Sequence, residues 1–239
     1  YEERVYREKM MPVNLLNFTV VEKETDLNIS AKVNLEIQTI EAIKKYRKDI
    51  IDYGNKFNEF YTSLEPVEVN CKTSEIISSM VKASQIAGVG PMASVAGAIS
   101  EFVGRELLRY SDEIIVENGG DLFIATKEKR NVLLYAGNSP FSEKICIEID
   151  PLDTPIGICT SSGTVGHSLS FGKADAVIII SQNTSLADAV ATAAGNIVKT
   201  QGDIIPAIDY VKSIPNILGG VIVFGDKLGV WGNVKLVSL

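Results

Sequence analysis

Residues 157–175 read GICTSSGTVGHSLSFGKAD and run directly into the apolar segment Ala176–Ile180. The unbroken apolar segment predicts a strand covered on both faces, because a strand with one wet face would alternate apolar and polar side chains. The residues before it are rich in Gly, Ser and Thr and include the chain's only histidine, His167. Glycine lets backbone N–H groups approach a ligand and hydroxyls add short donors, so this loop favours an anionic or ring-bearing small molecule. An irregular polar surface loop is the alternative.

Strands and helices are predicted on both sides of this segment. Short apolar runs bounded by turn residues predict strands at 17–21, 26–31, 114–117, 122–125, 132–136, 145–149, 156–160, 220–224 and 228–231. Residues 2–33 as a whole are expected to hold three short strands. Apolar residues spaced by three and four predict helices at 35–64, 74–87, 92–109, 186–198 and 205–211. Helices mixed with hairpin-linked strands indicate an α+β protein.

A Gly-Gly pair follows a helix and opens a strand twice, at 119–124 and at 219–224. This echo is compatible with a duplicated α+β unit. No Pro- or Ser-rich linker separates the two halves, roughly 1–136 and 137–239. They are therefore expected to share one core as a single domain, 1–239.

The amino-acid composition argues against some classes of binding partner. A formal net charge of −7 without a basic cluster argues against nucleic acid and against an anionic membrane surface. No apolar run approaches the roughly 20 residues of a membrane span, and the first residues lack an apolar signal core. The three widely spaced cysteines suit reduced thiols. A cytoplasmic protein is the expectation.

Two glycine-containing turns are candidate ligand loops. Gly88–Ala93 has the spacing of a dinucleotide fingerprint, but it follows a helical pattern rather than a strand, which argues against a Rossmann fold. It could still hold phosphate through free N–H groups at a helix entry, or be a tight turn with Pro91 in the first helical position. Asn118–Asp121 favours a hairpin turn and would place an amide and a carboxylate at its tip.

Asp188 and Thr192 are four residues apart and lie on one face at the start of a predicted helix. A carboxylate and a hydroxyl, with a carbonyl from elsewhere, could bind Mg²⁺ or Ca²⁺. A capping box formed by Ser185 and Asp188 is an equal alternative. Cys159 is either a reactive thiol or a buried apolar filler.

Six segments carry a resemblance to a known family. They are 24–27 ETDL, 89–99 VGPMASVAGAI, 116–121 VENGGD, 157–168 GICTSSGTVGHS, 187–192 ADAVAT and 229–232 GVWG. Together they resemble uncharacterised protein family 0280 of the ApbE-like superfamily over nearly the whole chain. The resemblance implies duplicated T-fold-like halves with antiparallel sheets and packed helices. The better-known relatives are flavin transferases, which use Mg²⁺ to cleave FAD and attach FMN to a Thr or Ser of a target protein.

The resemblance also implies roles for residues. Asp188 and Thr192 match a metal-binding Asp and Thr, while Asp121 or His167 would position or deprotonate the acceptor. The expected ligand-binding residues are Gly90, Pro91, Met92, Asn118, Gly119, Gly120, Thr160, Ser161, Ser162, Gly163 and Thr164. The implied partners are Mg²⁺ or Ca²⁺, FAD or another nucleotide-like ligand, and a protein acceptor. Exposed edges of T-fold-like sheets would also suit a homo-oligomer.

The sequence departs from the transferase pattern in places. The segment after Gly163 is shorter and lacks a His-x-x-Asp-Pro-x-Thr-Gly-like run, and Pro91-Met92 replaces a Lys-Gly pair. Fold and pocket location are therefore expected to carry over better than FAD cleavage and FMN transfer. A binding or sensor protein that has lost the chemistry is the alternative. A hydrolase using Ser162 with His167 is a third reading, although no G-x-S-x-G motif supports it.

Overall fold

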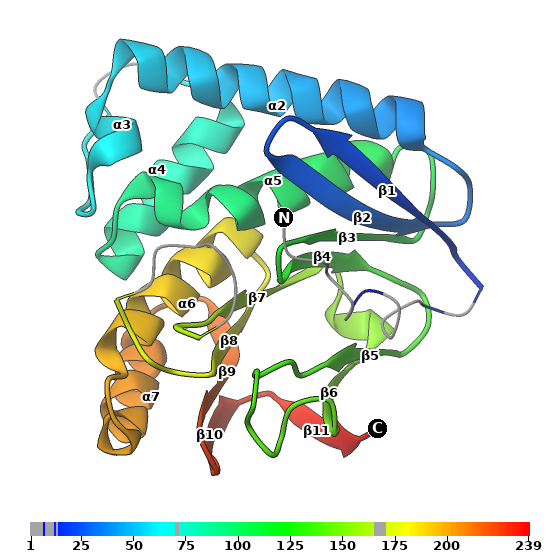
Figure 1. The fold of residues 1–239 in the computed structure, drawn as a ribbon. Coiled ribbons are helices and arrows are strands. Elements are labelled where there is room, and N and C mark those ends of the chain that lie inside the picture. The colour runs from blue at the N-terminus through cyan, green and yellow to red at the C-terminus, as the bar shows by residue number, and fades with distance from the viewer. Residues whose placement is uncertain (1–6, 8–11, 13, 70–71, 165–170) are drawn as a thin grey trace.

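The computed structural model describes residues 7, 12, 14–69, 72–164 and 171–239, which form two antiparallel sheets and a layer of helices (Figure 1). Sheet A has the strand order β1-β2-β3-β4-β7-β8-β9-β10, and sheet B has the order β11-β6-β5. The strands are β1 (Leu16–Glu22), β2 (Thr25–Ala31), β3 (Ile114–Asn118), β4 (Asp121–Ala125), β5 (Arg130–Leu133), β6 (Ile145–Ile149), β7 (Ile156–Ser161), β8 (Ala176–Ser181), β9 (Ile217–Phe224), β10 (Lys227–Gly232) and β11 (Lys235–Ser238).

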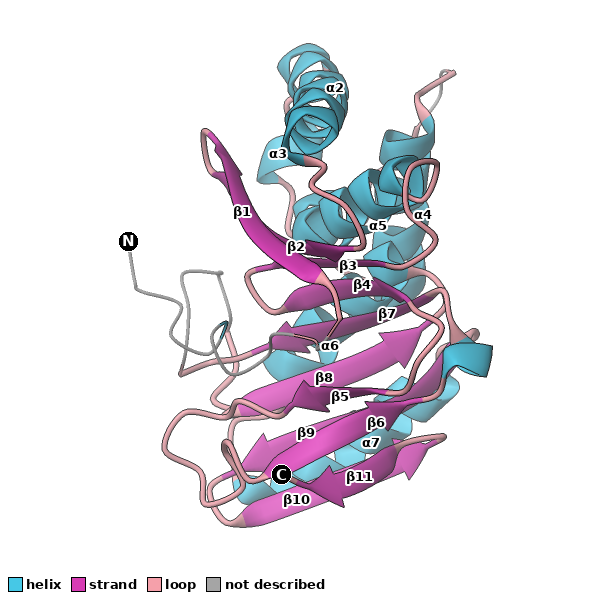
Figure 2. Cartoon of the chain, turned by 90° about the vertical axis from the view of Figure 1, so that its right-hand side faces the viewer, coloured by secondary structure: helices cyan, strands magenta, loops and turns pink. Residues whose placement is uncertain are grey.

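The helices lie on one face of sheet A, and sheet B lies on the other (Figure 2). The α-helices are α2 (Glu36–Lys56), α3 (Glu59–Thr62), α4 (Glu75–Ala87), α5 (Val95–Leu107), α6 (Thr184–Ile197) and α7 (Ile204–Ser213), and the 3-10 helices are η1 (Pro91–Ser94), η2 (Pro151–Asp153) and η3 (Gln201–Asp203). One apolar cluster joins α2, α4 and α5 to β2–β4, and a second joins α6 and α7 to β7–β9. A third fills the space between the two sheets.

Strand β8 shows why the segment at 176–180 is apolar without interruption. All six residues of β8 are buried. Val177 and Ile179 pack with the residues of α6 and α7, whereas Ile178 and Ile180 pack between the two sheets. The prediction of a strand covered on both faces is confirmed. The residues directly before β8 lie at one end of this central strand.

The helix expected at 35–64 is two helices. The chain leaves α2 at Phe57, whose backbone is not helical, and re-enters a short helix at Glu59. The break lets Phe60 turn into the core, where its ring packs edge-on against Tyr53 at 5.1 Å between ring centroids. The helix expected at 92–109 likewise consists of a 3-10 turn followed by α5.

Two other expectations concern strands. The pair at 17–21 and 26–31 forms the hairpin β1–β2, whereas a further strand nearer the N-terminus would lie outside the described residues. Strand β11 was not predicted. It pairs with β6 and completes sheet B, and its four residues carry too short a pattern to identify a strand from sequence.

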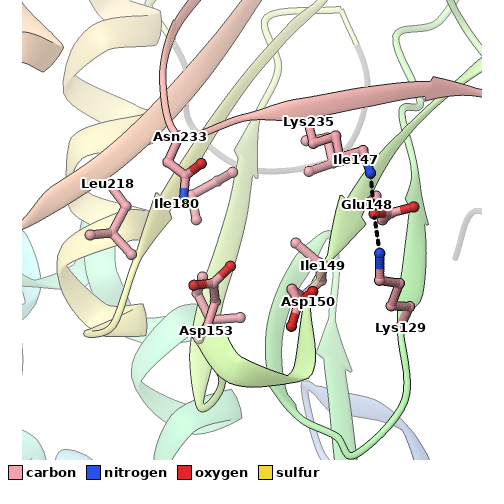
Figure 3. Close-up of a pocket in the computed structure, with 11 residues that line it drawn as sticks. Lys129, Ile147, Glu148, Ile149, Asp150, Asp153, Ile180, Leu218, Asn233 and Lys235 are labelled. Carbon is pink, nitrogen blue, oxygen red and sulfur yellow. Dashed lines mark hydrogen bonds and ion pairs between the residues drawn. The ribbon is translucent and has the colours of Figure 1, made fainter.

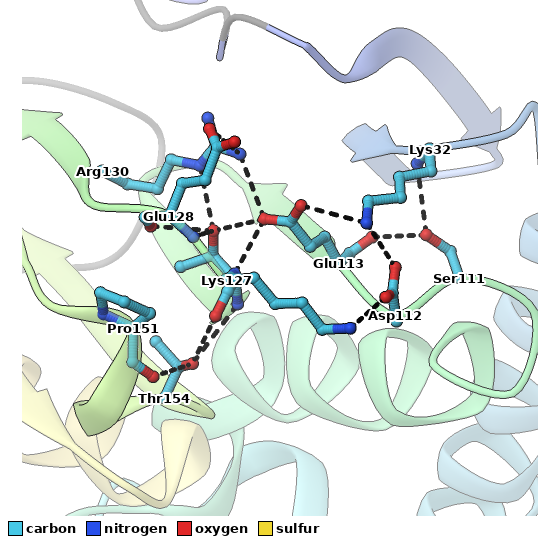
Figure 4. A network of polar contacts seen from close by, with 10 residues as sticks. Lys32, Ser111, Asp112, Glu113, Lys127, Glu128, Arg130, Pro151 and Thr154 are labelled. Carbon is cyan, nitrogen blue, oxygen red and sulfur yellow. Dashed lines mark hydrogen bonds and ion pairs between the residues drawn. The ribbon is translucent and has the colours of Figure 1, made fainter.

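A buried polar network closes one end of the β3–β4 hairpin (Figure 4). Glu113, directly before β3, accepts hydrogen bonds from the Thr126 hydroxyl at 2.7 Å, the Lys127 N–H at 2.9 Å and the Arg130 guanidinium at 3.2 Å. Burial alone would raise the pKa of Glu113, but these donors lower it to about 2. This carboxylate is thus satisfied within the fold.

Within the described part of the chain, no single helix is long and apolar enough to cross a membrane. The bent pair formed by α4 with residues Pro91–Leu107 meets the criterion by length and composition only. Most of the apolar side chains of this pair belong to the core beneath α2.

Candidate functional site

The hairpin turn between β3 and β4 places Asp121 at the end of sheet A opposite to Glu113. Asn118 and Asp121 form the last pair of the ladder, so the loop has two residues. Gly119 and Gly120 have φ values of +66° and +105°, which favour glycine in a two-residue hairpin turn. The Asn118 side-chain amide donates to the Ala96 carbonyl at 3.1 Å and ties the turn to α5. Asp121 is only 6 % exposed, and its Oδ1 accepts the Thr160 N–H at 3.2 Å.

Asp188 reaches the same region from the second turn of α6. Its Oδ2 accepts the N–H of Gly97, in the first turn of α5, at 2.8 Å. The two helices approach so closely that a Cβ at Gly97 would lie 2.6 Å from the Thr184 carbonyl oxygen and 2.7 Å from the Asp188 Cβ. Glycine is therefore required at this crossing. Asp188 caps the neighbouring helix rather than its own.

Glu101 provides the reciprocal contact from α5 to α6. It is 2 % exposed, and its Oε2 accepts the N–H groups of Thr184 at 2.7 Å and Ser185 at 3.3 Å. Arg105 pairs with its other oxygen at 2.6 Å. Each helix thus supplies a carboxylate to the positive N-terminal end of the other. Sequence inspection missed Glu101, because its position in the helix pattern gives no sign of this long-range contact.

The capping box considered for Ser185 and Asp188 is wrong. Helix α6 is capped by Asn183, whose side chain accepts the Leu186 N–H at 2.7 Å. The Ser185 hydroxyl instead accepts a hydrogen bond from Ser79 of α4. Asn183 therefore provides the local cap, and Ser185 takes part in a contact with α4 instead.

Burial disfavours the ionisation of both Asp121 and Asp188, and the charge of Asp188 further disfavours that of Asp121. Burial, and then the charge of Asp188, raise the pKa of Asp121 well above its ordinary value. Burial also raises the pKa of Asp188 to about 7, although N–H groups of Gly97 and Ala96 act in the opposite direction. Within the described residues, no cationic side chain contributes to either shift. The two buried carboxyl groups therefore lie close together without a cationic partner among the described residues.

Cys159 lies behind this pair and is fully buried. Its thiol donates to the Thr184 carbonyl, with 3.4 Å between sulfur and oxygen. Burial and the charge of Asp121 raise the pKa of Cys159 well above its usual range. The interpretation as a buried filler is confirmed, because a thiol in this environment is not ionised at neutral pH.

The strand end and loop at 160–164 border the same region. Thr160 lies beside Gly120, Ser161 beside Gly195, and both are partly exposed. The Ser162 hydroxyl accepts the Thr164 N–H at 3.1 Å, and the Gly163 N–H donates to the Ala174 carbonyl at 2.9 Å. Thr160–Thr164 therefore present an ordered row of small polar groups. His167 falls outside the described residues, so its predicted role remains a prediction.

The other predicted residues occupy different environments. Thr192 lies one turn after Asp188 on α6 and is partly exposed. Met92 is also partly exposed, in the short helix η1 that packs against α6. Gly90 directly precedes η1 and Pro91 is its first residue; both are buried, and Gly90 packs against the backbone of Ser63.

A separate cavity of about 210 Å³ lies at the far end of the strands (Figure 3). It opens where β7 begins, near Ile156, whereas the predicted residues lie where β7 ends. Lys129 and Lys235, on its rim, both pair with Glu148 Oε1, at 3.1 and 2.7 Å. Glu148 therefore has cationic partners, unlike the Asp121–Asp188 pair among the described residues.

The chain is similar to a known family of proteins. A family model described as "AbpE bacteria" matches residues 8–211. A UPF0280 protein of Methanococcus aeolicus is 40% identical over 220 residues, covering 88% of each chain. The chain belongs to the UPF0280 family. Another UPF0280 protein, from Methanospirillum hungatei, is 41% identical over 214 residues, covering 89% of this chain and 86% of its own.

Solved structures place this UPF0280 chain in the ApbE-like fold. The flavin transferase ApbE of Vibrio cholerae superposes with a TM-score of 0.58 at 12% identity, covering 92% of this chain and 97% of its own. The ApbE protein of Thermotoga maritima gives a TM-score of 0.59 at 12% identity, covering 90% and 96%. The predicted α+β, ApbE-like architecture of helices and antiparallel sheets is confirmed.

Proposed function

We propose that this protein binds a flavin or related nucleotide together with a divalent cation at the Asp121–Asp188 end of sheet A, and that it transfers FMN from FAD to a protein acceptor. The observation that carries the proposal is the buried carboxylate pair itself. Two carboxylates without a cationic side chain among the described residues form a site that a bound cation would stabilise. The flavin-transferase neighbours supply the ligand class.

The available donors suit a hard cation. Carboxylate oxygens of Asp188 and the hydroxyl of Thr192, one helical turn away, are oxygen ligands of the kind that Mg²⁺ and Ca²⁺ prefer. The described residues contain no group of three or more His, Cys, Asp or Glu side chains arranged for a metal. Water and ligand oxygens would therefore complete the coordination, which is usual for Mg²⁺. A bound cation would neutralise a pyrophosphate and stabilise its leaving oxygen.

The chain's own residues would orient the ligand and move the proton. Thr160–Thr164 place partly exposed and exposed hydroxyl groups at the edge of the site. Asp121 is fixed by the Thr160 N–H, and a bound cation would favour its ionised form, which could take up the proton of an acceptor hydroxyl. Its immobility would keep this oxygen in place during the reaction.

A binding or sensor protein without turnover is the second candidate function. The observation that favours it is the mutual capping of α5 and α6. Asp188 and Glu101 occupy N–H groups at the two helix starts, so these positive ends are partly neutralised and less able to hold phosphate.

The release of AMP from FAD distinguishes the two functions. Incubation with FAD, Mg²⁺ and a Thr- or Ser-containing acceptor, followed by chromatography, should show AMP and flavin-labelled acceptor. Asp121→Asn should retain FAD binding and lose AMP release, because it removes the proton acceptor and keeps the side-chain shape. FAD binding without release of AMP under all these conditions would identify a binding protein.

A further inference from the structure

Arg7 is a described residue of the N-terminal segment, and it binds two buried carboxylates of sheet A. Its Nη1 donates to Asp26 Oδ1 at 2.8 Å, and its Nη2 donates to the Asp26 carbonyl at 3.0 Å. Its Nε donates to Glu117 Oε2 at 2.6 Å. Asp26 lies in β2 and Glu117 in β3, so the guanidinium bridges neighbouring strands. All three side chains are about nine-tenths buried or more.

Glu117 connects this bridge to the hairpin turn of the candidate site. While Oε2 binds Arg7, Oε1 accepts the N–H of Gly120 at 3.0 Å. Gly120 immediately precedes Asp121, and its backbone lies against Thr160. A single carboxylate therefore links the N-terminal segment to the turn that carries Asp121.

We propose that Arg7 is a positioning residue for the candidate site: by neutralising Glu117, it keeps Glu117 Oε1 on the Gly120 N–H and thereby fixes the turn beside Asp121. A buried carboxylate that loses a guanidinium contact is held less firmly and moves toward water. Such a movement weakens the hydrogen bond that Glu117 Oε1 accepts from the Gly120 N–H. The effect on ligand binding rests on the proposed function, whereas the effect on the turn does not.

The geometry requires arginine rather than any cation. Three guanidinium nitrogens contact Asp26 and Glu117 at once, and a planar fork can satisfy both partners without rearrangement. A lysine ammonium is a single point donor on a shorter stem. Arg7→Lys is therefore expected to keep the charge but to hold the turn only partly.

Amide hydrogen exchange in the ligand-free protein tests the positioning role. In Arg7→Gln, the Gly120 amide should exchange at least about tenfold faster than in the wild type. The amides of Thr184 and Ser185, held by a different carboxylate, serve as internal controls and should change less than about twofold. Arg7→Lys should give an intermediate rate, and it provides the comparison if Arg7→Gln does not fold.

The double variant Arg7→Gln/Glu117→Gln separates positioning from loss of bulk stability. A glutamine at 117 still offers an oxygen to Gly120 and needs no cation, so protection of Gly120 should return. Wild-type exchange at Gly120 in Arg7→Gln would overturn the proposal. A rise shared equally by Thr184 and Ser185, or no recovery in the double variant, would also overturn it.

The same variants then report on the ligand. FAD affinity should fall about tenfold in Arg7→Gln and recover in the double variant. If the wild type binds no FAD, the proposed function fails while the exchange measurement still decides the role of Arg7. If FAD binds equally to all variants, the turn does not position the ligand, and the proposal is overturned for the site.

Discussion

The β3–β4 hairpin carries a buried carboxylate at each end, and the two are in opposite environments. Glu113 is surrounded by Arg130, Lys127 and Thr126, and its pKa is lowered to about 2. Asp121, at the other end, is buried beside Asp188, and its pKa is raised. The same hairpin therefore places one carboxylate where the fold stabilises its charge and the other where the fold opposes it.

The difference distinguishes a buried carboxylate that stabilises the fold from one that is suited to bind a ligand. A buried charge with its donors in place has no further requirement for a partner. A buried pair of like charges costs free energy unless a bound cation or ligand compensates it. Such pairs are typical of functional sites. The contrast makes specific predictions for each end.

The largest effect on stability is expected at the Glu113 end. Arg130→Met should lower the free energy of unfolding by about 3–5 kcal/mol, because Glu113 keeps its burial and loses its buried cation, which leaves, among the described residues, only the half-exposed Lys32 at 3.5 Å. Chemical denaturation measures the change. Adding Glu113→Gln to Arg130→Met should recover part of the loss, and an Arg130→Met protein as stable as the wild type would contradict this account of the network.

Lowering the pH should reduce the stability of the protein through the same carboxylate, Glu113. The pKa of Glu113 is lower in the folded protein than its ordinary value, so its contribution is present above about pH 4.5 and is lost as pH falls toward about 2. The loss amounts to about 2–3 kcal/mol. Denaturation curves between these pH values should show this slope in the wild type. The slope attributable to this group should disappear in Glu113→Gln.

Neutralising Asp188, beside the other end of the hairpin, should not lower the free energy of unfolding. Asp188→Asn at pH 8 removes the repulsion with Asp121 and keeps an oxygen for the Gly97 N–H. We expect the free energy of unfolding to stay equal or to rise by up to about 1 kcal/mol. Thermal melting of the ligand-free protein checks this. A loss of several kcal/mol would show that Asp188 is primarily a helix cap.

The smallest effect is expected at Ser162. Ser162→Ala should change stability by less than about 0.5 kcal/mol, because the side chain lies in a partly exposed loop. A serine-directed phosphonate should leave the wild-type protein unlabelled. Covalent labelling at Ser162 that requires His167 would instead support the hydrolase alternative.

The sequence predicted most elements of sheet A because their patterns are local. The apolar run at 176–180 and the Asn-Gly turn at 118–121 each identify an element by themselves. The break at Phe57 depends on where Phe60 must pack, and β11 depends on pairing with a distant strand. Such long-range causes leave little trace in the local pattern.

The residues of the candidate site were likewise predicted only where a local motif identified them. Asp121 and Asp188 were identified from motifs, but the effect of Asp188 on the ionisation of Asp121 is visible only when β4 and α6 are brought together. Glu101 and Arg7 were missed because an isolated charged residue in a helix or near a terminus usually faces solvent. Their partners lie on other elements, far along the chain.

Calorimetric titration with FAD, with and without Mg²⁺, tests the central claim most directly. The uncompensated carboxylate pair predicts that Mg²⁺ tightens binding by at least about tenfold and that Asp188→Asn abolishes this gain. Asp153→Asn, which changes a carboxylate at the separate cavity, should behave like the wild type. Binding that is absent, or that is indifferent to both Mg²⁺ and Asp188, would contradict the account.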